Sequence, residues 1–249
     1  MKDSSRSVRV WDLPTRLFHG ALVAFVVTGF LTGADEGVLL MVHTWVGYVV
    51  LLLVLFRIAW GFVGGEHARF RSFVRPWPEV GRYLGRVARL VPERHLGHTP
   101  LGGWMILLML ATLLAVALSG MLVAEEGFAT PLSRALPGLA GEGVKALHEF
   151  LGNAVMVLAA IHLAAVAGHR LLTGDRIVRA MVTGSKPAPE GEAWSDARPA
   201  GRGRAAALAF GLLVLGGYLV AATEFGAGAE DAEGGEESEE GGEGERDDD

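Results

Sequence analysis

The stretch that decides the fold is His148-Glu149-Phe150-Leu151-Gly152-Asn153-Ala154-Val155-Met156-Val157-Leu158-Ala159-Ala160-Ile161-His162, an apolar run with a histidine at each end. An α-helix rises about 1.5 Å per residue, so its two imidazoles lie about 21 Å apart and, after nearly four turns, face the same way. The hydrocarbon core of a bilayer is about 30 Å thick. One membrane helix can therefore offer an imidazole to each half of the bilayer.

Two further histidines lie in apolar stretches, His19 at the start of the first and His43 at the start of the second. Ionisable side chains inside membrane spans are costly and usually belong to a functional site. His19 and His43 form two pairs with His148 and His162, at opposite depths of the membrane. This arrangement favours a membrane protein that holds two haems, each between two histidines. A proton relay or polar packing is the alternative explanation.

The composition agrees with a polytopic membrane protein. The chain has 249 residues, of which 51% are hydrophobic and 20% charged, and its mean hydropathy is +0.35. Charge must therefore be concentrated between apolar segments. The sequence has no cysteine, which excludes disulfides, thiolate-bound clusters and covalent c-type haem attachment. Any haem must be held without a thioether bond, and we expect membrane lipid rather than nucleic acid around the chain.

Five apolar segments are long enough to cross or nearly cross a bilayer. They are Leu17 to Thr32, Leu39 to Val63, Gly102 to Ala124, Val144 to Leu172, and Ala205 to Ala222. The predicted fold class is all-α: an integral membrane four-helix bundle with a fifth, C-terminal transmembrane helix. The first segment is short unless it begins near Leu13, and an alternative is a signal peptide cleaved near Thr32, which would discard His19.

The loops predict the orientation. The connection from Phe62 to Gly103 carries seven arginines against three glutamates, and the segment after the fourth span is also basic. Basic loops stay in the cytoplasm, so we expect a cytoplasmic N-terminus in the bacterial inner membrane. His19 and His162 then form the inner pair, and His43 and His148 the outer pair.

The C-terminal region differs in composition from the rest. Residues 224–249 contain 13 Asp or Glu and one Arg, a net charge of −12, which leaves +6 for the remaining chain. We expect a disordered acidic tail. It is either a solvated terminus or a periplasmic segment that attracts a basic redox partner electrostatically. The predicted organisation is a di-haem membrane domain over 1–184, a cytoplasmic linker over 185–204, a fifth helix over 205–222 and the tail over 223–249.

Neighbouring residues refine the ligand assignment. Gly47 and Gly152 each follow a proposed outer ligand by four residues, so a flat macrocycle could approach the helix there, although such glycines also permit close helix contact. His169, seven residues after His162, is a rival inner ligand. The histidines of the basic loop are expected to be solvated surface residues: His67, His95 and His98.

Several motifs together resemble the bacterial cytochrome b561 and nickel-hydrogenase b-type cytochrome family. They are Trp11-Asp12-Leu13-Pro14-Thr15-Arg16-Leu17-Phe18-His19, His43-Thr44-Trp45-Val46-Gly47-Tyr48, Phe56-Arg57-Ile58-Ala59-Trp60-Gly61-Phe62, His67-Ala68-Arg69-Phe70, Leu96-Gly97-His98-Thr99-Pro100-Leu101-Gly102-Gly103-Trp104, Leu147-His148-Glu149 and Ile161-His162.

The resemblance covers about Val8 to Gly184 and implies a four-helix core with two non-covalent haem b groups. Its ligands come from the first, second and fourth helices, here His19, His43, His148 and His162. The fifth helix and the acidic tail depart from the family's usual core, so nothing about their function is implied.

We expect electron transfer through the membrane rather than chemistry on a substrate, because two imidazoles fill both axial positions of each iron. Arg16, Arg57 and Arg75 are candidate partners of the inner haem propionates, although arginine at this depth also follows from the positive-inside rule. The leading hypothesis is a carrier between membrane quinone and a periplasmic partner, either a c-type cytochrome or an oxidoreductase subunit. The alternatives are the membrane anchor of a hydrogenase-like complex and a haem-free proton or ion transporter.

Overall fold

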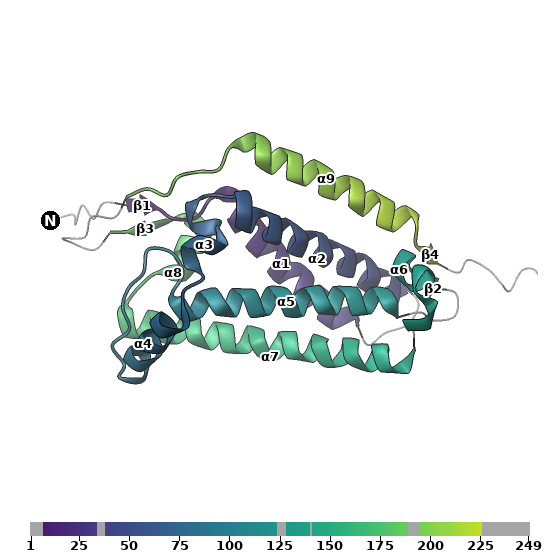
Figure 1. The fold of residues 1–249 in the computed structure, drawn as a ribbon, viewed down its shortest axis with the longest axis horizontal. Helices are drawn as coiled ribbons and strands as arrows, with labels where there is room; N and C mark the ends of the chain where they lie inside the picture. The colour runs from purple at the N-terminus through teal and green to yellow at the C-terminus, as the bar shows by residue number, and fades with distance from the viewer. Residues whose placement is uncertain (1–6, 34–37, 124–127, 140, 189–194, 226–249) are drawn as a thin grey trace, which may run out of the picture.

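Five long apolar helices run roughly side by side in the computed structural model, which describes residues 7–33, 38–123, 128–139, 141–188 and 195–225 (Figure 1). Each is long and apolar enough to cross a membrane. They are α1 (Leu13–Thr32), α2 (Val38–Val63), α5 (Pro100–Leu122), α7 (Glu142–Thr173) and α9 (Arg202–Ala221). The predicted all-α membrane fold is confirmed, including a first helix that begins at Leu13.

Local capping explains where these helices begin and end. The carboxylate of Asp12 accepts a hydrogen bond from the Thr15 amide (3.0 Å), and Pro14 stands in the first turn of α1. The Thr99 hydroxyl caps α5 in the same way, just before Pro100. Helix α7 ends at Gly174, whose φ of 67° lies in the left-handed region that favours glycine.

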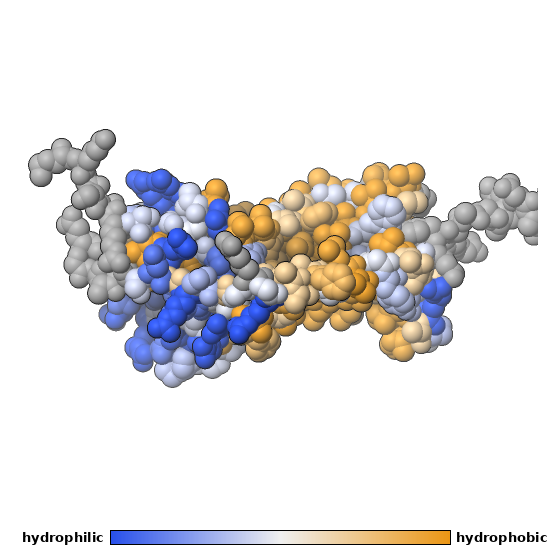
Figure 2. Space-filling view, turned by 90° about the horizontal axis from the view of Figure 1, so that it is seen from above, coloured by the Kyte–Doolittle hydropathy of each residue, from blue (hydrophilic) through white to orange (hydrophobic). Residues whose placement is uncertain are grey.

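The bundle is held together by pairwise helix packing. Helix α1 packs on α2, α5 packs on α7, and α2 also contacts α5 and α9. The central cluster includes Val54, Leu110 and Leu113, and α7 contributes only Val155 to the buried residues. Many apolar side chains face outward, and Figure 2 shows them along the middle of the molecule, where lipid would surround them.

Short elements cover the two ends of the bundle. One end, called the basic end here, carries η1 (Glu66–Ala68), α3 (Phe70–Phe73), α4 (Trp77–Ala88), α8 (Ile177–Thr183), β1 (Ser7–Arg9) and β3 (Ser185–Pro187). Strands β1 and β3 pair antiparallel, with Val8 opposite Lys186. Hydrophilic side chains gather at this end in Figure 2.

The opposite end carries β2 (Phe128–Ala129), α6 (Pro131–Ala135), η2 (Pro137–Leu139) and β4 (Glu224–Phe225), and β2 pairs with β4. A buried hydrogen bond between the hydroxyls of Tyr48 and Thr223 fastens the end of α9 to α2. The division of the chain at residues 184, 204 and 222 stays a prediction. The acidic tail from residue 226 onward lies outside the described residues.

Candidate functional site

His43 and His148 face each other at the end of the bundle opposite the basic end. His43 lies near the start of α2 and His148 near the start of α7. Their ring centroids are 5.9 Å apart, and their ring planes are perpendicular, at 89°. The structure therefore brings together two of the four histidines that the sequence singled out.

Each of these rings is anchored through Nδ1 to a neighbouring helix. The Nδ1 atom of His43 lies 2.9 Å from the carbonyl oxygen of Gly29 on α1, and that of His148 lies 3.0 Å from the carbonyl oxygen of Val116 on α5. A carbonyl oxygen only accepts hydrogen bonds, so Nδ1 must carry the proton in both rings. The lone pair is then on Nε2, the form in which a neutral histidine binds a metal.

The second pair consists of His19 on α1 and His162 on α7. Both rings are half-buried and near enough to interact electrostatically. Helix α7 is unbroken from Glu142 to Thr173, so His148 and His162 are separated by about 21 Å along its axis. His19 and His162 thus lie near each other, and their pairing as ligands stays a prediction.

Open space lies at Gly47 and Gly152, each one helical turn after a histidine of this pair. A Cβ atom built on Gly47 or on Gly152 would meet no described heavy atom within 4 Å. Close helix contact therefore does not explain these two glycines, and the alternative interpretation, room for a flat group, fits the geometry. By contrast, a Cβ on Gly216 would come within 2.8 Å of Cδ1 of Leu52, so α9 packs closely on α2 at this glycine.

Arg57 is the most deeply buried arginine candidate. Its side chain is 3% exposed, and neither Nη1 nor Nη2 has a hydrogen-bond partner among the described residues. The guanidinium lies over the rings of Phe70 and Phe73, 5.5 and 5.6 Å from their centroids. A buried guanidinium with free donors is costly unless an anion accepts from it, so Arg57 fits a carboxylate-bearing group such as a haem.

The other two candidate arginines differ from Arg57. The Nη2 atom of Arg16 donates to the Val182 carbonyl, while its Nε is buried without a partner. Arg75 is exposed, and its Nη2 donates to the carbonyl of Ser72 (3.1 Å). Of the three, Arg57 and Arg16 keep buried donors that a propionate could use.

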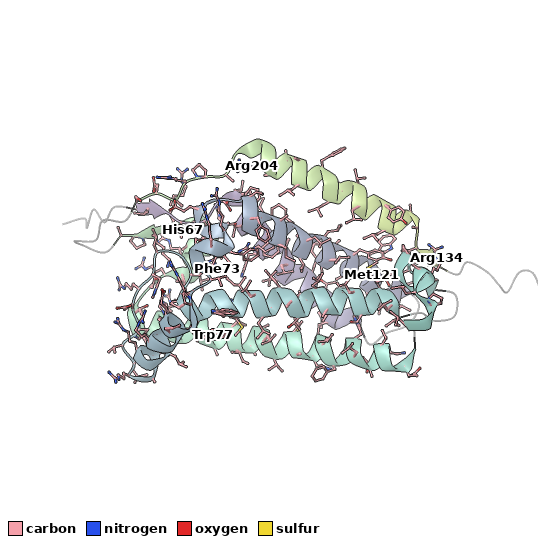
Figure 3. All side chains as sticks on the ribbon, in the orientation of Figure 1. His67, Phe73, Trp77, Met121, Arg134 and Arg204 are labelled. Carbon is pink, nitrogen blue, oxygen red and sulfur yellow. The ribbon has the colours of Figure 1, made fainter. Side chains whose placement is uncertain are left out.

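The prediction that the loop histidines are solvated is wrong for His98. Its ring lies between those of Trp11 and Phe73, with centroids 4.6 Å away in each case, and its Nδ1 is buried without a partner. Burial, together with the charge of Arg57, lowers the pKa of His98 to about 3. Burial also lowers the pKa of His67 and of His95. Figure 3 shows His67 and Phe73 at the basic end, far from Met121 and Arg134.

His169, the rival inner ligand, belongs to a polar cluster at the basic end. Its Nδ1 lies 3.4 Å from the Tyr83 hydroxyl and its Nε2 lies 3.9 Å from Asp175, which forms a buried ion pair with Lys186 (2.8 Å). Burial alone would raise the pKa of Asp175, but hydrogen bonds from His169 and Lys186 outweigh it and lower that pKa. Both ring nitrogens of His169 thus face this cluster.

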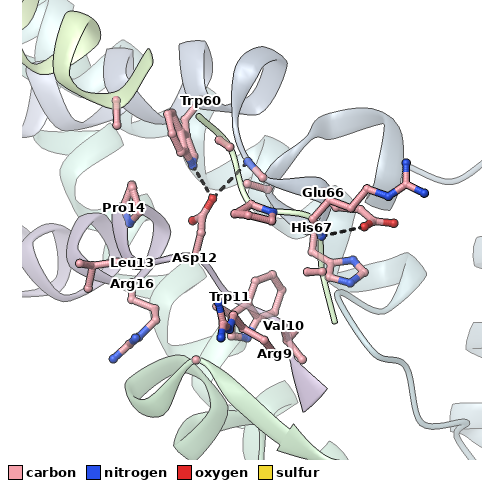
Figure 4. Close-up of a pocket in the computed structure, with 18 of the residues that line it drawn as sticks. Arg9, Val10, Trp11, Asp12, Leu13, Pro14, Arg16, Trp60, Glu66 and His67 are labelled. Carbon is pink, nitrogen blue, oxygen red and sulfur yellow. Dashed lines mark hydrogen bonds between the residues drawn. The ribbon is translucent and has the colours of Figure 1, made fainter. Parts of the chain in front are cut away.

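A cavity of about 500 Å³ opens at the basic end between β1, the first turn of α1, the end of α2 and residues 197–201 (Figure 4). Asp12 lies at its wall and accepts hydrogen bonds from Trp60 Nε1 and the Gly65 amide, both 3.1 Å long. Sequence reasoning missed this role, although Asp12 directly before Leu13-Pro14 is a typical helix-start signal. Asp12 therefore joins the start of α1 to the end of α2.

Comparisons with known proteins identify the family of the chain. The family model described as prokaryotic cytochrome b561 matches residues 10–184. A probable Ni/Fe-hydrogenase B-type cytochrome subunit of Rhizobium leguminosarum bv. viciae is 27% identical over 149 residues, covering 49% of this chain and 62% of that protein. The protein of the same name from Azotobacter chroococcum mcd 1 is 32% identical over 123 residues, covering 39% and 50%.

The chain thus spans about half to three fifths of the length of these curated relatives. No solved structure matches it. The family model covers well over half of the chain and contains all four paired histidines. This multi-pass membrane protein therefore belongs to the prokaryotic cytochrome b561 family of b-type cytochrome electron carriers.

Proposed function

We propose that the chain carries electrons through the membrane on two non-covalent haem b groups. His19 and His162 hold the haem nearer the basic end, and His43 and His148 hold the other. The observation that carries the proposal is the 5.9 Å between the centroids of His43 and His148. Bonds from imidazole to a metal are about 2.0–2.1 Å long in zinc sites, and with similar bonds to iron two imidazoles on opposite sides of one ion have centroids about 6 Å apart.

Arg57 and Arg16 would donate hydrogen bonds to the propionates of the haem near the basic end. The free Nη atoms of Arg57 and the buried Nε of Arg16 are the donors available for these carboxylates. An arginine fork and a carboxylate form strong, oriented hydrogen bonds. The two residues would thus fix the orientation of the macrocycle and neutralise its charge below the membrane surface.

The haem supplies reversible one-electron chemistry, and the chain supplies position and surroundings. With two histidines to hold each haem, the chain would favour electron transfer over binding of dioxygen. The apolar bundle with its surrounding lipid would keep water from the haems, and α7 would set the separation of the two sites. Because both pairs include a ligand from α7, a single helix would guide the electron from one half of the membrane to the other.

The basic end lies in the cytoplasm in this proposal, in accord with the positive-inside rule. The electron partners would be the quinone pool and a periplasmic redox protein, either a c-type cytochrome or an oxidoreductase subunit. A second candidate is the membrane subunit of a hydrogenase complex, which the names of the relatives favour. Copurification of a hydrogenase with the tagged chain from its native membrane would distinguish the second candidate from the first.

Replacement of single histidines tests the ligand assignment. His162→Ala should remove the haem near the basic end and leave the other, and His148→Ala should do the reverse. His169→Ala is the matched control on the same helix and should leave both. Haem content with reduced-minus-oxidised spectra measures the outcome, and full haem content in His162→Ala would refute the assignment of that residue.

A further inference from the structure

Helices α1 and α5 carry the same short pattern opposite His43 and His148. On α1 it is Gly29-Phe30-Leu31-Thr32-Gly33, and on α5 it is Val116-Ala117-Leu118-Ser119-Gly120. In each, the first residue offers its carbonyl oxygen to the imidazole, the fourth is a hydroxyl residue and the fifth is glycine. We call the two segments the imidazole cradles.

The hydroxyl group of each cradle lies near the same Nδ1 atom as the carbonyl. Thr32 Oγ1 is 3.4 Å from Nδ1 of His43, and Ser119 Oγ is 3.3 Å from Nδ1 of His148. Each hydroxyl donates its own hydrogen to a backbone carbonyl, Thr32 to Thr28 (2.9 Å) and Ser119 to Val116 (3.0 Å). Its oxygen is therefore free to accept from the imidazole N–H.

The glycine of each cradle allows the ring to lie against the helix. A Cβ atom on Gly33 would come within 3.2 Å of Cε1 of His43. A Cβ atom on Gly120 would come within 2.7 Å of Cε1 of His148. Both hydroxyl residues are buried, Thr32 at 8% and Ser119 at 6% exposure, so water does not compete for the imidazole N–H.

We propose that Thr32 and Ser119 are positioning residues that lower the potential of the haem held by His43 and His148, an inference that rests on the proposed function. Two acceptors on each Nδ1–H fix the tautomer and the ring plane and increase the basicity of Nε2. A more basic ligand stabilises oxidised iron. The rings of His19 and His162 have no hydrogen-bond partner among the described residues, so only one of the two haems receives this effect.

The competing explanation is that the Thr32 and Ser119 hydroxyls only form hydrogen bonds with carbonyls of their own helices, as Ser and Thr often do in membrane helices. The chain offers controls for it. Thr28 on α1 and Thr112 on α5 donate to carbonyls four residues earlier, at 3.0 and 2.9 Å, and among the described residues neither hydroxyl has a hydrogen bond with an imidazole. Thr28→Val and Thr112→Val remove the same kind of bond without touching a cradle.

The test is a redox titration of the purified full-length chain, followed by optical and electron paramagnetic resonance spectra. Thr32→Val and Ser119→Ala should each raise the midpoint potential of one haem and leave the other unchanged. A tenfold change in the ratio of reduced to oxidised haem corresponds to about 59 mV for one electron, and we expect a change of this order in the double variant. The strongly anisotropic low-spin signal that perpendicular imidazoles produce should change with it.

The conservative variant Thr32→Ser keeps the hydroxyl and should restore the wild-type potential. Loss of one haem in Thr32→Val that Thr32→Ser prevents would also support the inference. Potentials and spectra identical to those of Thr28→Val and Thr112→Val, with full haem content, would overturn it. If Thr32→Val does not accumulate, Ser119→Ala decides the question alone. Wild-type protein without haem would instead overturn the proposed function.

Discussion

Alanine at the two cradle glycines should displace the imidazoles by different distances. Carbon atoms in contact are about 3.5–4.0 Å apart. In Gly120→Ala the new Cβ would lie 2.7 Å from Cε1 of His148, so the ring must retreat by at least about 0.8 Å. In Gly33→Ala the corresponding distance to His43 is 3.2 Å, and a shift of about 0.3 Å suffices.

Metal–ligand distances tolerate deviations of about 0.2 Å, so only Gly120→Ala moves its imidazole well beyond this range. We expect a loss of roughly tenfold or more in affinity for the haem of this pair, about 1.4 kcal/mol. The Gly33→Ala variant should bind both haems, with a smaller loss of affinity for the haem of His43 and His148. Gly211→Ala on α9, where a Cβ would meet nothing within 4 Å, is the control and should bind as the wild type does.

The measurement for these three variants is the amount of haem that remains bound after detergent extraction. A redox titration assigns the remaining haem to the two sites. The expected order of retention is Gly211→Ala, then Gly33→Ala, then Gly120→Ala. Full retention with unchanged potentials in Gly120→Ala would refute the account of how His148 is held.

Three further predictions concern the basic end and the orientation. Asp12→Ala removes the cap of α1 and the acceptor for Trp60 and Gly65, so thermal unfolding in detergent should show a loss of roughly 2–4 kcal/mol, with a smaller loss in Asp12→Asn. His98 has a pKa of about 3 in the folded chain and 6.5 in the unfolded chain, so the unfolded chain binds an extra proton and stability falls as the pH drops from 6.5 toward 3. His98→Gln should therefore make the melting temperature depend less on pH. Equal slopes of melting temperature against pH in the variant and the wild type would contradict this prediction. Reporters fused after Gly65 and after Arg198 should be cytoplasmic, and one at the C-terminus periplasmic; a cytoplasmic C-terminus would show that α9 does not cross.

Features that depend on periodicity were predictable from the sequence. The spacing of His148 and His162 predicted one continuous helix with both imidazoles in the bundle, and α7 runs unbroken through both. For Gly47 and Gly152 the sequence left two explanations open, and the open space found at both glycines disfavours close helix contact. The prediction for α7 succeeds because helical geometry alone relates residues a whole number of turns apart.

Features that depend on contacts between distant segments were not predictable. The cradle hydroxyls Thr32 and Ser119 meet imidazoles on other helices, and this requires a rotation of each helix that its own sequence does not specify. The burial of His98 arises because Trp11, far away in the chain, covers its ring. A basic loop suggests solvent exposure from its composition, but Phe73 within that loop provides the other wall of an apolar pocket.

The haem content of the purified chain tests the binding of two haem b groups most directly. A pyridine haemochrome assay on protein quantified by amino-acid analysis gives the number of haem b groups per chain. We expect two haem b groups per chain, one held by His19 with His162 and one held by His43 with His148. One haem b per chain, or none, would contradict this expectation.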